Sequence, residues 1–241
     1  MLVSYAHPFR TTVVIVLALV VAPIALAEVN LFVYGGKAYT HDSDVDLKRP
    51  PGTDLTFKDV SWDDKSFTSP PYWGARVGYW FERAPEWGLA LDYIHAKIVA
   101  RLEDSVEVSG NRAGTTVAGA EKLSETFGNL QFSDGYNLLM LNGQYRIRLD
   151  PVFQPYVGLG AGVAVPHVEI EVDGTETRGY QLAGPAGQAL AGLGVNVGEH
   201  LVVFGEYKFS VADLEADLDN GGTVETTPLT HHFVIGGGVR F

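Results

Sequence analysis

Cysteine is absent from the sequence, so neither a disulfide framework nor a zinc–thiolate site can form. Basic residues are also scarce: 17 Lys and Arg stand against 29 Asp and Glu, and the formal net charge of −12 argues against nucleic acid as a partner. No Walker motif, serine-elbow motif or His-Glu-x-x-His motif is present. The run Gly158-x-Gly160-x-Gly162 has no predicted helix after it, so the sequence indicates no nucleotide or flavin site.

Long hydrophobic runs are missing except near the N-terminus. A segment with a basic residue at Arg10 precedes an apolar run over 13–21 and the small-x-small pattern at Ala25-Leu26-Ala27. That run has about half of the roughly 20 residues that a spanning helix needs. We therefore expect a signal peptide over residues 1–27 and a single domain over residues 28–241. Any insertion of this domain into a membrane must use strands closed into a barrel, because lipid cannot satisfy exposed backbone polar groups.

Apolar and polar residues alternate with a period of two in eight segments. Between 73 and 82, Trp73, Val77 and Phe81 share one parity, whereas Arg76 and Glu82 share the other. The first parity suits lipid and the second a polar barrel interior. The other predicted strands cover about 29–39, 87–98, 139–146, 155–167, 180–197, 203–211 and 233–241.

The links between these segments fall into two length classes. Short links at 83–86, 149–154 and 198–200 alternate with long links at roughly 40–70, 99–130, 168–179 and 212–229. Outer-membrane barrels have short periplasmic turns and longer extracellular loops. The pattern predicts an all-β protein of the bacterial outer membrane: an eight-stranded antiparallel transmembrane β-barrel with long extracellular loops and short periplasmic turns.

The alternative is a soluble lipocalin-like barrel or sandwich, which would keep its apolar residues inside. Against it stand residues of both charges on the inward parity, which can pair across a barrel too narrow for a channel. Inward glycines such as Gly158, Gly160 and Gly192 are expected to leave room for bulky partners such as Arg76 and Trp80. The inward polar residues are Arg76, Glu82, Asp92, Arg146, Gln188, Glu206, Lys208 and Arg240.

Histidines gather at the predicted extracellular strand ends, and His200 alone falls in a periplasmic turn. Imidazoles beside carboxylates suit iron, copper or zinc, so a metal site at this rim is one interpretation. The other is that these side chains face water, or contact lipopolysaccharide phosphates directly or through divalent cations. The rim residues include His41, His95, His167, His231, His232, Asp42, Asp44, Asp46, Asp134, Glu169, Asp213, Glu215 and Asp217.

Several segments, spread over nearly all of residues 28–241, resemble the outer-membrane lipid A oxidase family. That resemblance implies oxygen-dependent oxidation of the proximal glucosamine of lipid A to an aminogluconate, with release of hydrogen peroxide, and makes lipid A in the outer leaflet the expected partner. The segments that carry it are Thr40-His41-Asp42-Ser43-Asp44-Val45, Pro70-Pro71-Tyr72-Trp73-Gly74, Leu91-Asp92-Tyr93-Ile94-His95-Ala96-Lys97, Phe132-Ser133-Asp134-Gly135-Tyr136-Asn137, Pro166-His167-Val168-Glu169 and Tyr180-Gln181.

The resemblance brings no catalytic assignment with it, so residue roles are hypotheses drawn from the rim. The expected metal ligands are His41, His95, His167 and His232, and the expected catalytic residues are His41, His95, His167, Asp92 and Asp134. Lys65, Arg76 and Lys97 are expected to hold lipid A phosphate. Asp92 and His95 have opposite parities, so a shared inward site would require a bulge between them.

Two other functions fit a barrel of this kind. One is a non-enzymatic surface barrel of the OmpA type, acting in lipopolysaccharide binding, adhesion or envelope integrity. The other is a lipid A deacylase, which needs a serine and a histidine within reach on the outer face; Ser133 and Ser210 are the candidates. The sequence leaves the oligomeric state undetermined.

Overall fold

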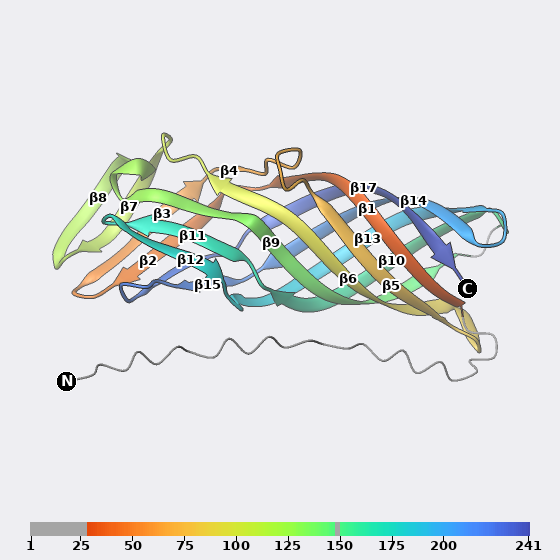
Figure 1. Cartoon of the computed structure of the whole chain (residues 1–241). Coiled ribbons are helices and arrows are strands. Elements are labelled where there is room, and N and C mark those ends of the chain that lie inside the picture. Colours follow the sequence, from red (N-terminus) through yellow and green to blue (C-terminus); the bar gives the residue numbers. More distant parts are fainter. Residues whose placement is uncertain (1–27, 148–149) are drawn as a thin grey trace, which may run out of the picture.

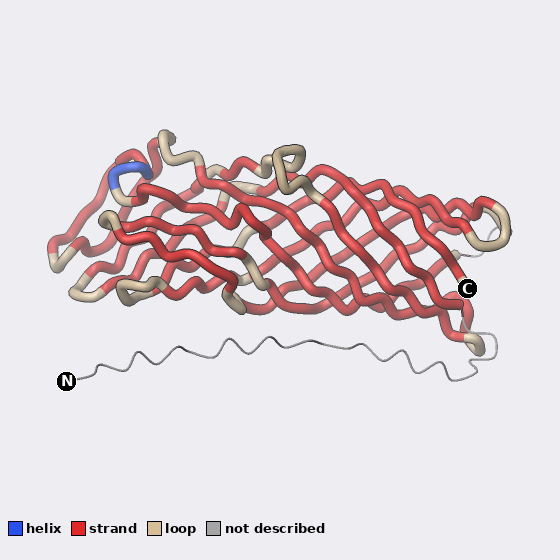
Figure 2. Tube along the Cα trace, viewed as in Figure 1, coloured by secondary structure: helices blue, strands red, loops and turns tan. Residues whose placement is uncertain are grey.

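The structure is a computed structural model that describes residues 28–147 and 150–241, and the expected signal peptide lies outside the described residues. Strands make up almost all of the described chain, which forms one long tube (Figures 1 and 2). Among these residues, no helix has the length and apolar character required to cross a bilayer.

Eight antiparallel strands close the barrel, each paired with the next along the chain, and the pairing of the last with the first seals the wall. These strands match the eight segments expected from the alternating pattern. They are β1 (Glu28–Thr40), β5 (Trp73–Phe81), β6 (Ala84–Ala100), β9 (Phe127–Arg146), β10 (Phe153–Ala164), β13 (Gly184–Val197), β14 (Leu201–Ala212) and β17 (Leu229–Arg240).

The surface of the barrel is apolar where it would meet lipid. Val77, Leu141 and Ile235 are 50%, 56% and 69% exposed, whereas a soluble barrel would bury them in its core. Aromatic rings contact one another near the strand ends on the same surface, for example Trp87 and Tyr145 with ring centroids 4.9 Å apart. The chain is therefore a transmembrane β-barrel, and the soluble alternative is excluded.

The barrel interior is filled by a charged network instead of a channel. Arg76 donates to Glu206 at 2.6 and 2.8 Å and to Asp92 at 2.9 Å, while Lys208 donates to Asp92 at 2.6 Å and to Tyr34 at 2.7 Å. All five side chains are buried, and the two positive charges balance the two negative ones. Buried charges are tolerated only when paired in this way.

Two of the residues expected inside lie elsewhere. Glu82 is exposed in the β5–β6 turn, and Arg240 donates to the carbonyl oxygen of Glu199 at the periplasmic rim. Both sit where a strand ends, so parity alone could not place them in the interior. The expectation is confirmed for the residues that lie deeper in the strands: Arg76, Asp92, Arg146, Gln188, Glu206 and Lys208 are buried.

Inward glycines make room for neighbouring side chains, as expected, although the partners differ. A Cβ at Gly192 would lie 2.5 Å from the ring of Tyr156, and one at Gly160 would lie 2.2 Å from the amide oxygen of Asn142. Trp80, one of the expected partners, is instead accommodated by Gly88, where a Cβ would lie 2.7 Å from the indole.

The long links, expected to be loops, continue the barrel wall outward as further strands at the end opposite the C-terminus (Figure 1). Six of these additional strands form a second sheet in the order β15-β16-β2-β3-β7-β8. Of the others, β11 and β12 extend from β9, and β4 pairs with β6. They are β2 (Ser43–Arg49), β3 (Thr53–Val60), β4 (Trp62–Asp63), β7 (Ser105–Arg112), β8 (Thr115–Lys122), β11 (His167–Val172), β12 (Thr175–Tyr180), β15 (Leu214–Asp217) and β16 (Thr223–Thr226), with a short 3-10 helix at Leu123–Glu125.

These extracellular strands invert the pattern of the membrane segment. Val45, Leu47, Leu55 and Phe57 point inward and are completely or almost completely buried, while the flanking charged residues Asp44, Lys48 and Lys58 are exposed. The strands therefore enclose an apolar core of their own above the membrane. The long strands β6 and β9 run from the membrane segment into the extracellular segment, and the candidate site lies where they pass from one to the other.

Candidate functional site

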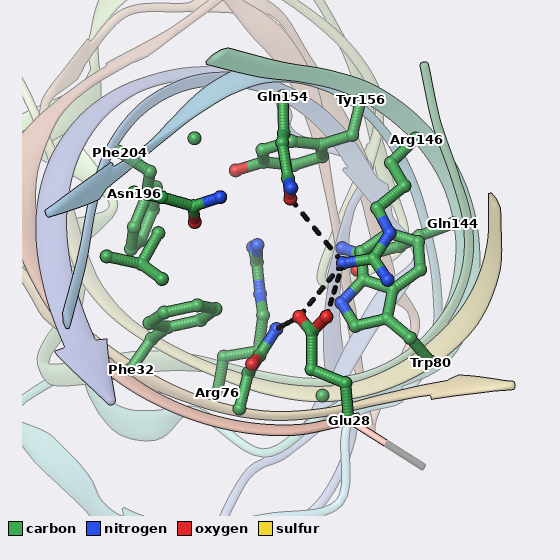
Figure 3. A pocket seen from close by; sticks show the side chains of 14 residues that line it. Glu28, Phe32, Arg76, Trp80, Gln144, Arg146, Gln154, Tyr156, Asn196 and Phe204 are labelled. Carbon is green, nitrogen blue, oxygen red and sulfur yellow. Dashed lines mark hydrogen bonds and ion pairs between the residues drawn. The ribbon is translucent and has the colours of Figure 1, made fainter. Parts of the chain in front are cut away.

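The cavity inside the barrel is too small to bind a substrate (Figure 3). It has a volume of about 40 Å³, which is room for one or two water molecules. Arg146 crosses it, donating to both oxygens of Glu28 at 2.9 Å and lying over the ring of Trp80 at 4.3 Å. The charged network around Arg76 closes the space above, so any chemistry on a large substrate must take place elsewhere.

On β6 the outward face changes from apolar to polar along the strand. Leu89 and Leu91 face lipid, and Tyr93, His95 and Lys97 follow on the same parity. The inward face changes in the opposite sense, from Asp92 to Ile94 and Ile98. The switch of apolar residues from the outward to the inward face marks the outer edge of the lipid-facing surface. It places polar, titratable side chains directly above the lipid-facing leucines.

A bulge in β9 opens the wall beside these residues. Ala96 pairs with Tyr136 and Ile98 with Phe132, so an advance of two residues along β6 corresponds to four residues along β9. Gly135 within the bulge has a φ of +134°, a conformation that favours glycine. The bulge turns Asp134 out of the strand, and bulges of this kind are frequent next to active sites.

His95 is held on the outer face by an asparagine. Its Nδ1 lies 2.9 Å from Asn137 Oδ1, which also accepts from the Tyr93 hydroxyl at 2.8 Å, and Asn137 Nδ2 donates to the carbonyl oxygen of Val165 at 3.2 Å. Trp73 covers the imidazole at a ring-centroid distance of 5.9 Å. His95 Nε2 is buried and has no hydrogen-bond partner.

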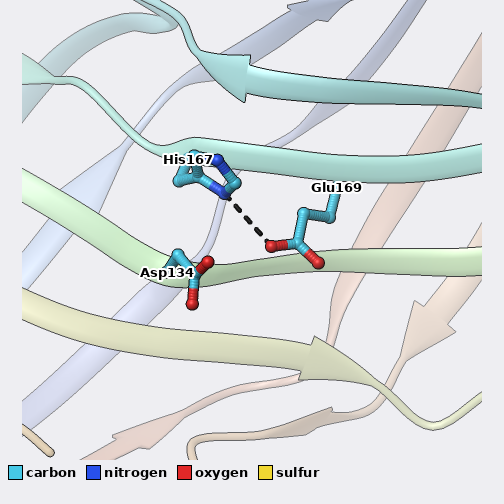
Figure 4. Close-up of side chains that lie close together, drawn as sticks. All are labelled: Asp134, His167 and Glu169. Carbon is cyan, nitrogen blue, oxygen red and sulfur yellow. Dashed lines mark ion pairs between the residues drawn. The ribbon is translucent and has the colours of Figure 1, made fainter. Parts of the chain in front are cut away.

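A second group, the triad of Asp134, His167 and Glu169, lies at the junction of β9 and β11 (Figure 4). His167 Nδ1 lies 3.2 Å from Glu169 Oε1. Among the described residues, this triad is the group of three whose imidazole and carboxylate atoms have metal-ligand spacing, all within 4.8 Å of one another. Arg178 contacts Glu169 at 3.3 Å and Asp134 at 3.6 Å.

Lys97 connects the two groups electrostatically. Its ammonium donates to the carbonyl oxygen of Ser69 at 2.8 Å and lies within range of the charges of Asp134, Glu169 and Lys65. We call Tyr93, His95, Lys97, Asp134, Asn137, His167 and Glu169 together the outer-face site.

Lys65 is exposed in the link between β4 and β5, which is tied to β1. Asp64 accepts from Thr40 through both the backbone and the hydroxyl, at 3.0 and 2.6 Å, and Ser66 Oγ accepts from the backbone of Ala38 at 3.0 Å. Burial raises the pKa of Asp64 above its ordinary value. The anchors on either side of Lys65 fix the position of the link, which leaves the lysine facing solvent.

The other predicted ligands lie away from the outer-face site. His41 is exposed at the end of β1 with its Nε2 2.7 Å from His231 Nε2, whereas His232 points into the barrel, 3.2 Å from the Tyr72 hydroxyl. Asp92 and Arg76 belong to the interior network. The structure thus brings His167 and Asp134 together and places Lys97 near them, but it does not assemble the four predicted histidines.

Several residues of the site were not among the predicted ones. Glu169 was counted only as a rim acid, although its spacing of two from His167 puts both side chains on one face of a strand. That parity was a usable signal. Asn137 gave none, because its role depends on which strands are neighbours and on the bulge in β9.

The deacylase interpretation loses its serine–histidine pair. Ser210 Oγ lies 2.8 Å from His232 Nε2, but both residues are completely buried inside the barrel, where no acyl chain can reach them. Ser133 lies in the bulge of β9. The nearby histidine His95 contacts Asn137 and not this serine.

No protein-family model matches the sequence, and no curated protein matches it. Among solved structures, the fold is similar to Neisserial surface protein A, with 11% identity over 89% of this chain and 97% of that chain and a TM-score of 0.42. It is also similar to Ail, the attachment invasion locus protein of Yersinia pestis (15% identity, 89% and 99%, TM-score 0.41), and to the outer membrane protease OmpT from Escherichia coli (9% identity, 89% and 96%, TM-score 0.39). These likenesses concern the fold alone.

Proposed function

We propose that this chain is an outer-membrane enzyme that oxidises the proximal glucosamine of lipid A to an aminogluconate, working from the outside of the barrel wall. The reaction is the one implied by the sequence resemblance. The observation that supports it is the outer-face site, whose residues have the outward parity of the wall, although His95, Lys97 and Glu169 are mostly covered by neighbouring side chains.

The depth of the site suits a lipid headgroup. A strand rises about 3.3 Å per residue, so His95 lies roughly 13 Å along β6 from Leu91. The polar headgroup layer begins where the hydrocarbon ends and is about 5 to 8 Å thick on each side of the membrane. With the strand tilted, the span from Tyr93 to Lys97 covers this layer, and a lipid A molecule beside Leu89 and Leu91 presents its sugars there.

The reaction needs a group that accepts a proton from the sugar. Oxidation of a free anomeric centre removes its hydroxyl proton together with the hydrogen and electron pair of the C1–H bond, and oxygen takes up two electrons and two protons to become hydrogen peroxide. The resulting lactone is opened by water to the aminogluconate. His95 Nε2, which has no hydrogen-bond partner, is the base assigned to the first step, and Lys97 and Lys65 supply positive charge for phosphate.

Lipid A from cells with and without this gene, compared by mass spectrometry, tests the proposal. We expect a gain of one oxygen atom only when the gene is present, and peroxide release when the refolded barrel receives lipid A with a free anomeric hydroxyl, oxygen and divalent metals. His95→Gln and His167→Ala should abolish both signals, whereas His200→Ala, in a periplasmic turn, should retain them. Unmodified lipid A with the folded wild-type protein under all of these conditions would refute the assignment.

The extracellular sheet favours a second candidate, a surface barrel that contacts other molecules. The β7–β8 hairpin lies at the far tip of the molecule, and nearly all of β8 is exposed (Figure 1). Deleting residues 105–122 should weaken adhesion of the cells and leave lipid A unchanged if this is the function. Unaltered adhesion in that strain would count against it.

A further inference from the structure

We propose that Asp134, His167 and Glu169 bind a divalent first-row transition metal ion on the outer face of the barrel. The inference deepens the proposed function, because it gives the same site an ion, but the binding itself can be measured without lipid A. One imidazole and two carboxylates form a ligand set that suits these metals. A metal bound this way would lie at the outer leaflet, open to a ligand from the membrane side.

The spacing of the three groups is close to that of a filled site. Metal–nitrogen and metal–oxygen bonds of about 2.0 to 2.2 Å separate two ligand atoms of one ion by roughly 3 to 3.5 Å. His167 Nδ1 and Glu169 Oε1 are already 3.2 Å apart, and that nitrogen is buried without a hydrogen-bond partner. The carboxylate of Asp134 lies within 4.8 Å of both, so a small side-chain rotation completes the set.

Neighbouring groups fix the orientation of the ligands, as they do in metal sites generally. Gln131 Nε2 donates to Glu169 Oε2 at 3.0 Å, which turns the other carboxylate oxygen toward His167. The Tyr180 hydroxyl donates to the carbonyl oxygen of Asp134 at 3.2 Å and thereby holds the bulge of β9 in place. The Tyr180 ring also packs against the imidazole of His167, with centroids 4.9 Å apart.

A cation would have to displace Arg178 from the two carboxylates. The Arg178 side chain is 57% exposed and reaches both acids, while the Lys97 ammonium lies farther off within range of their charges. An exposed arginine on β12 can swing into water when an ion takes its place, since its pairing there is worth little. Arg178 therefore competes with the metal, and removing its charge should strengthen metal binding.

The test uses the full barrel, refolded in detergent and stripped with a chelator, then titrated with Co²⁺ by visible absorption and with Zn²⁺ by calorimetry. We expect one saturable site in the wild type. His167→Ala and Glu169→Gln should weaken binding by at least about tenfold, the lower bound for losing even a supporting contact. Arg178→Gln should tighten it. His41→Ala is the matched control, because the exposed His41–His231 pair is a second imidazole group that could attract these ions.

Three results would overturn the inference: no saturable binding by the folded wild type, binding lost in His41→Ala but kept in His167→Ala, or Ca²⁺ binding equal to that of Co²⁺ and Zn²⁺, which would indicate a lipopolysaccharide-bridging cation. The heat-dependent gel mobility of folded barrels shows that each variant has folded. Metal binding with unmodified lipid A refutes only the proposed function, and lipid A oxidation without metal at this triad refutes only the inference.

Discussion

Asp92 and His95 are three residues apart on β6 yet lie on opposite sides of the barrel wall. Asp92 is enclosed and accepts from Arg76 and Lys208, whereas His95 contacts Asn137 on the outer face. The sequence allowed the two residues to share a site only with a bulge between them, and the pairing of β6 with β5 is regular from Asp92 to His95. One therefore contributes to the stability of the barrel and the other to its surface chemistry, and the two roles can be tested independently.

Asp92→Ala should destabilise the barrel strongly. It leaves the buried charges of Arg76 and Lys208 with Glu206 as their acidic partner, and breaking a buried ion pair costs about 3 to 5 kcal/mol. Urea unfolding of the refolded protein in detergent, followed by tryptophan fluorescence, measures the loss. His95→Ala removes a hydrogen bond on the outer face and should cost about 1 kcal/mol. Equal losses in the two variants would contradict the division of roles.

Gly74→Ala should disturb the same network from β5, the strand between those that carry Tyr34 and Asp92. A Cβ at this position would lie 2.2 Å from the ring of Tyr34, which contacts both Asp92 and Lys208. Overpacking of this kind costs about 1 to 3 kcal/mol. Gly205→Ala is the control, because a Cβ there meets no atom within 4 Å. Unfolding midpoints that fall equally in both variants would show that general strand effects, and not the Tyr34 ring, cause the loss.

Leu141→Arg tests the membrane-facing surface. Leu141 pairs with Leu91 and Ala161 in the middle of the apolar belt, where an arginine costs about 2 to 4 kcal/mol. Ala118→Arg, on the exposed β8 strand above the membrane, should change stability by less than about 0.5 kcal/mol. Folding into vesicles, measured as the fraction protected from protease, distinguishes the two. An arginine tolerated equally at both positions would contradict the placement of the belt.

The fold was predictable where each residue's environment follows from parity. Alternation located all eight membrane strands and put Arg76 and Glu206 inside, because a strand between lipid and a narrow interior has only two environments. The extracellular strands also alternate, with Val45, Leu47 and Phe57 on one parity, but their apolar face points inward, and the long links were interpreted as loops.

The site was less predictable, because its assembly is not a property of any one strand. Adjacent His231 and His232 face opposite sides of the wall, so grouping the rim histidines by height alone misplaced His232. Asp134 reaches His167 because of the bulge in β9 and because β11 extends from that strand. Neither the bulge nor this pairing leaves a periodic signal in the sequence. Parity could have linked Glu169 to His167, but not to Asp134.

Phe57→Ala should separate the stability of the extracellular sheet from that of the membrane barrel. Phe57 is completely buried above the membrane against Phe127, at a ring-centroid distance of 5.2 Å, and removing such a side chain costs about 3 to 5 kcal/mol. The eight membrane strands keep their own pairing and their interior network. We therefore expect faster protease cleavage within 43–60, with the folded gel mobility of the barrel retained.

Lys58→Ala is the matched control for this variant. Lys58 follows Phe57 on β3 but faces water, where its ion pair with Asp44 contributes little to stability. Protease cleavage should remain at the wild-type rate in Lys58→Ala. If Phe57→Ala instead abolished the folded mobility altogether, the apolar core above the membrane and the charged interior within it would form one cooperative unit. The outer-face site, which lies where the two regions meet, would then depend on both.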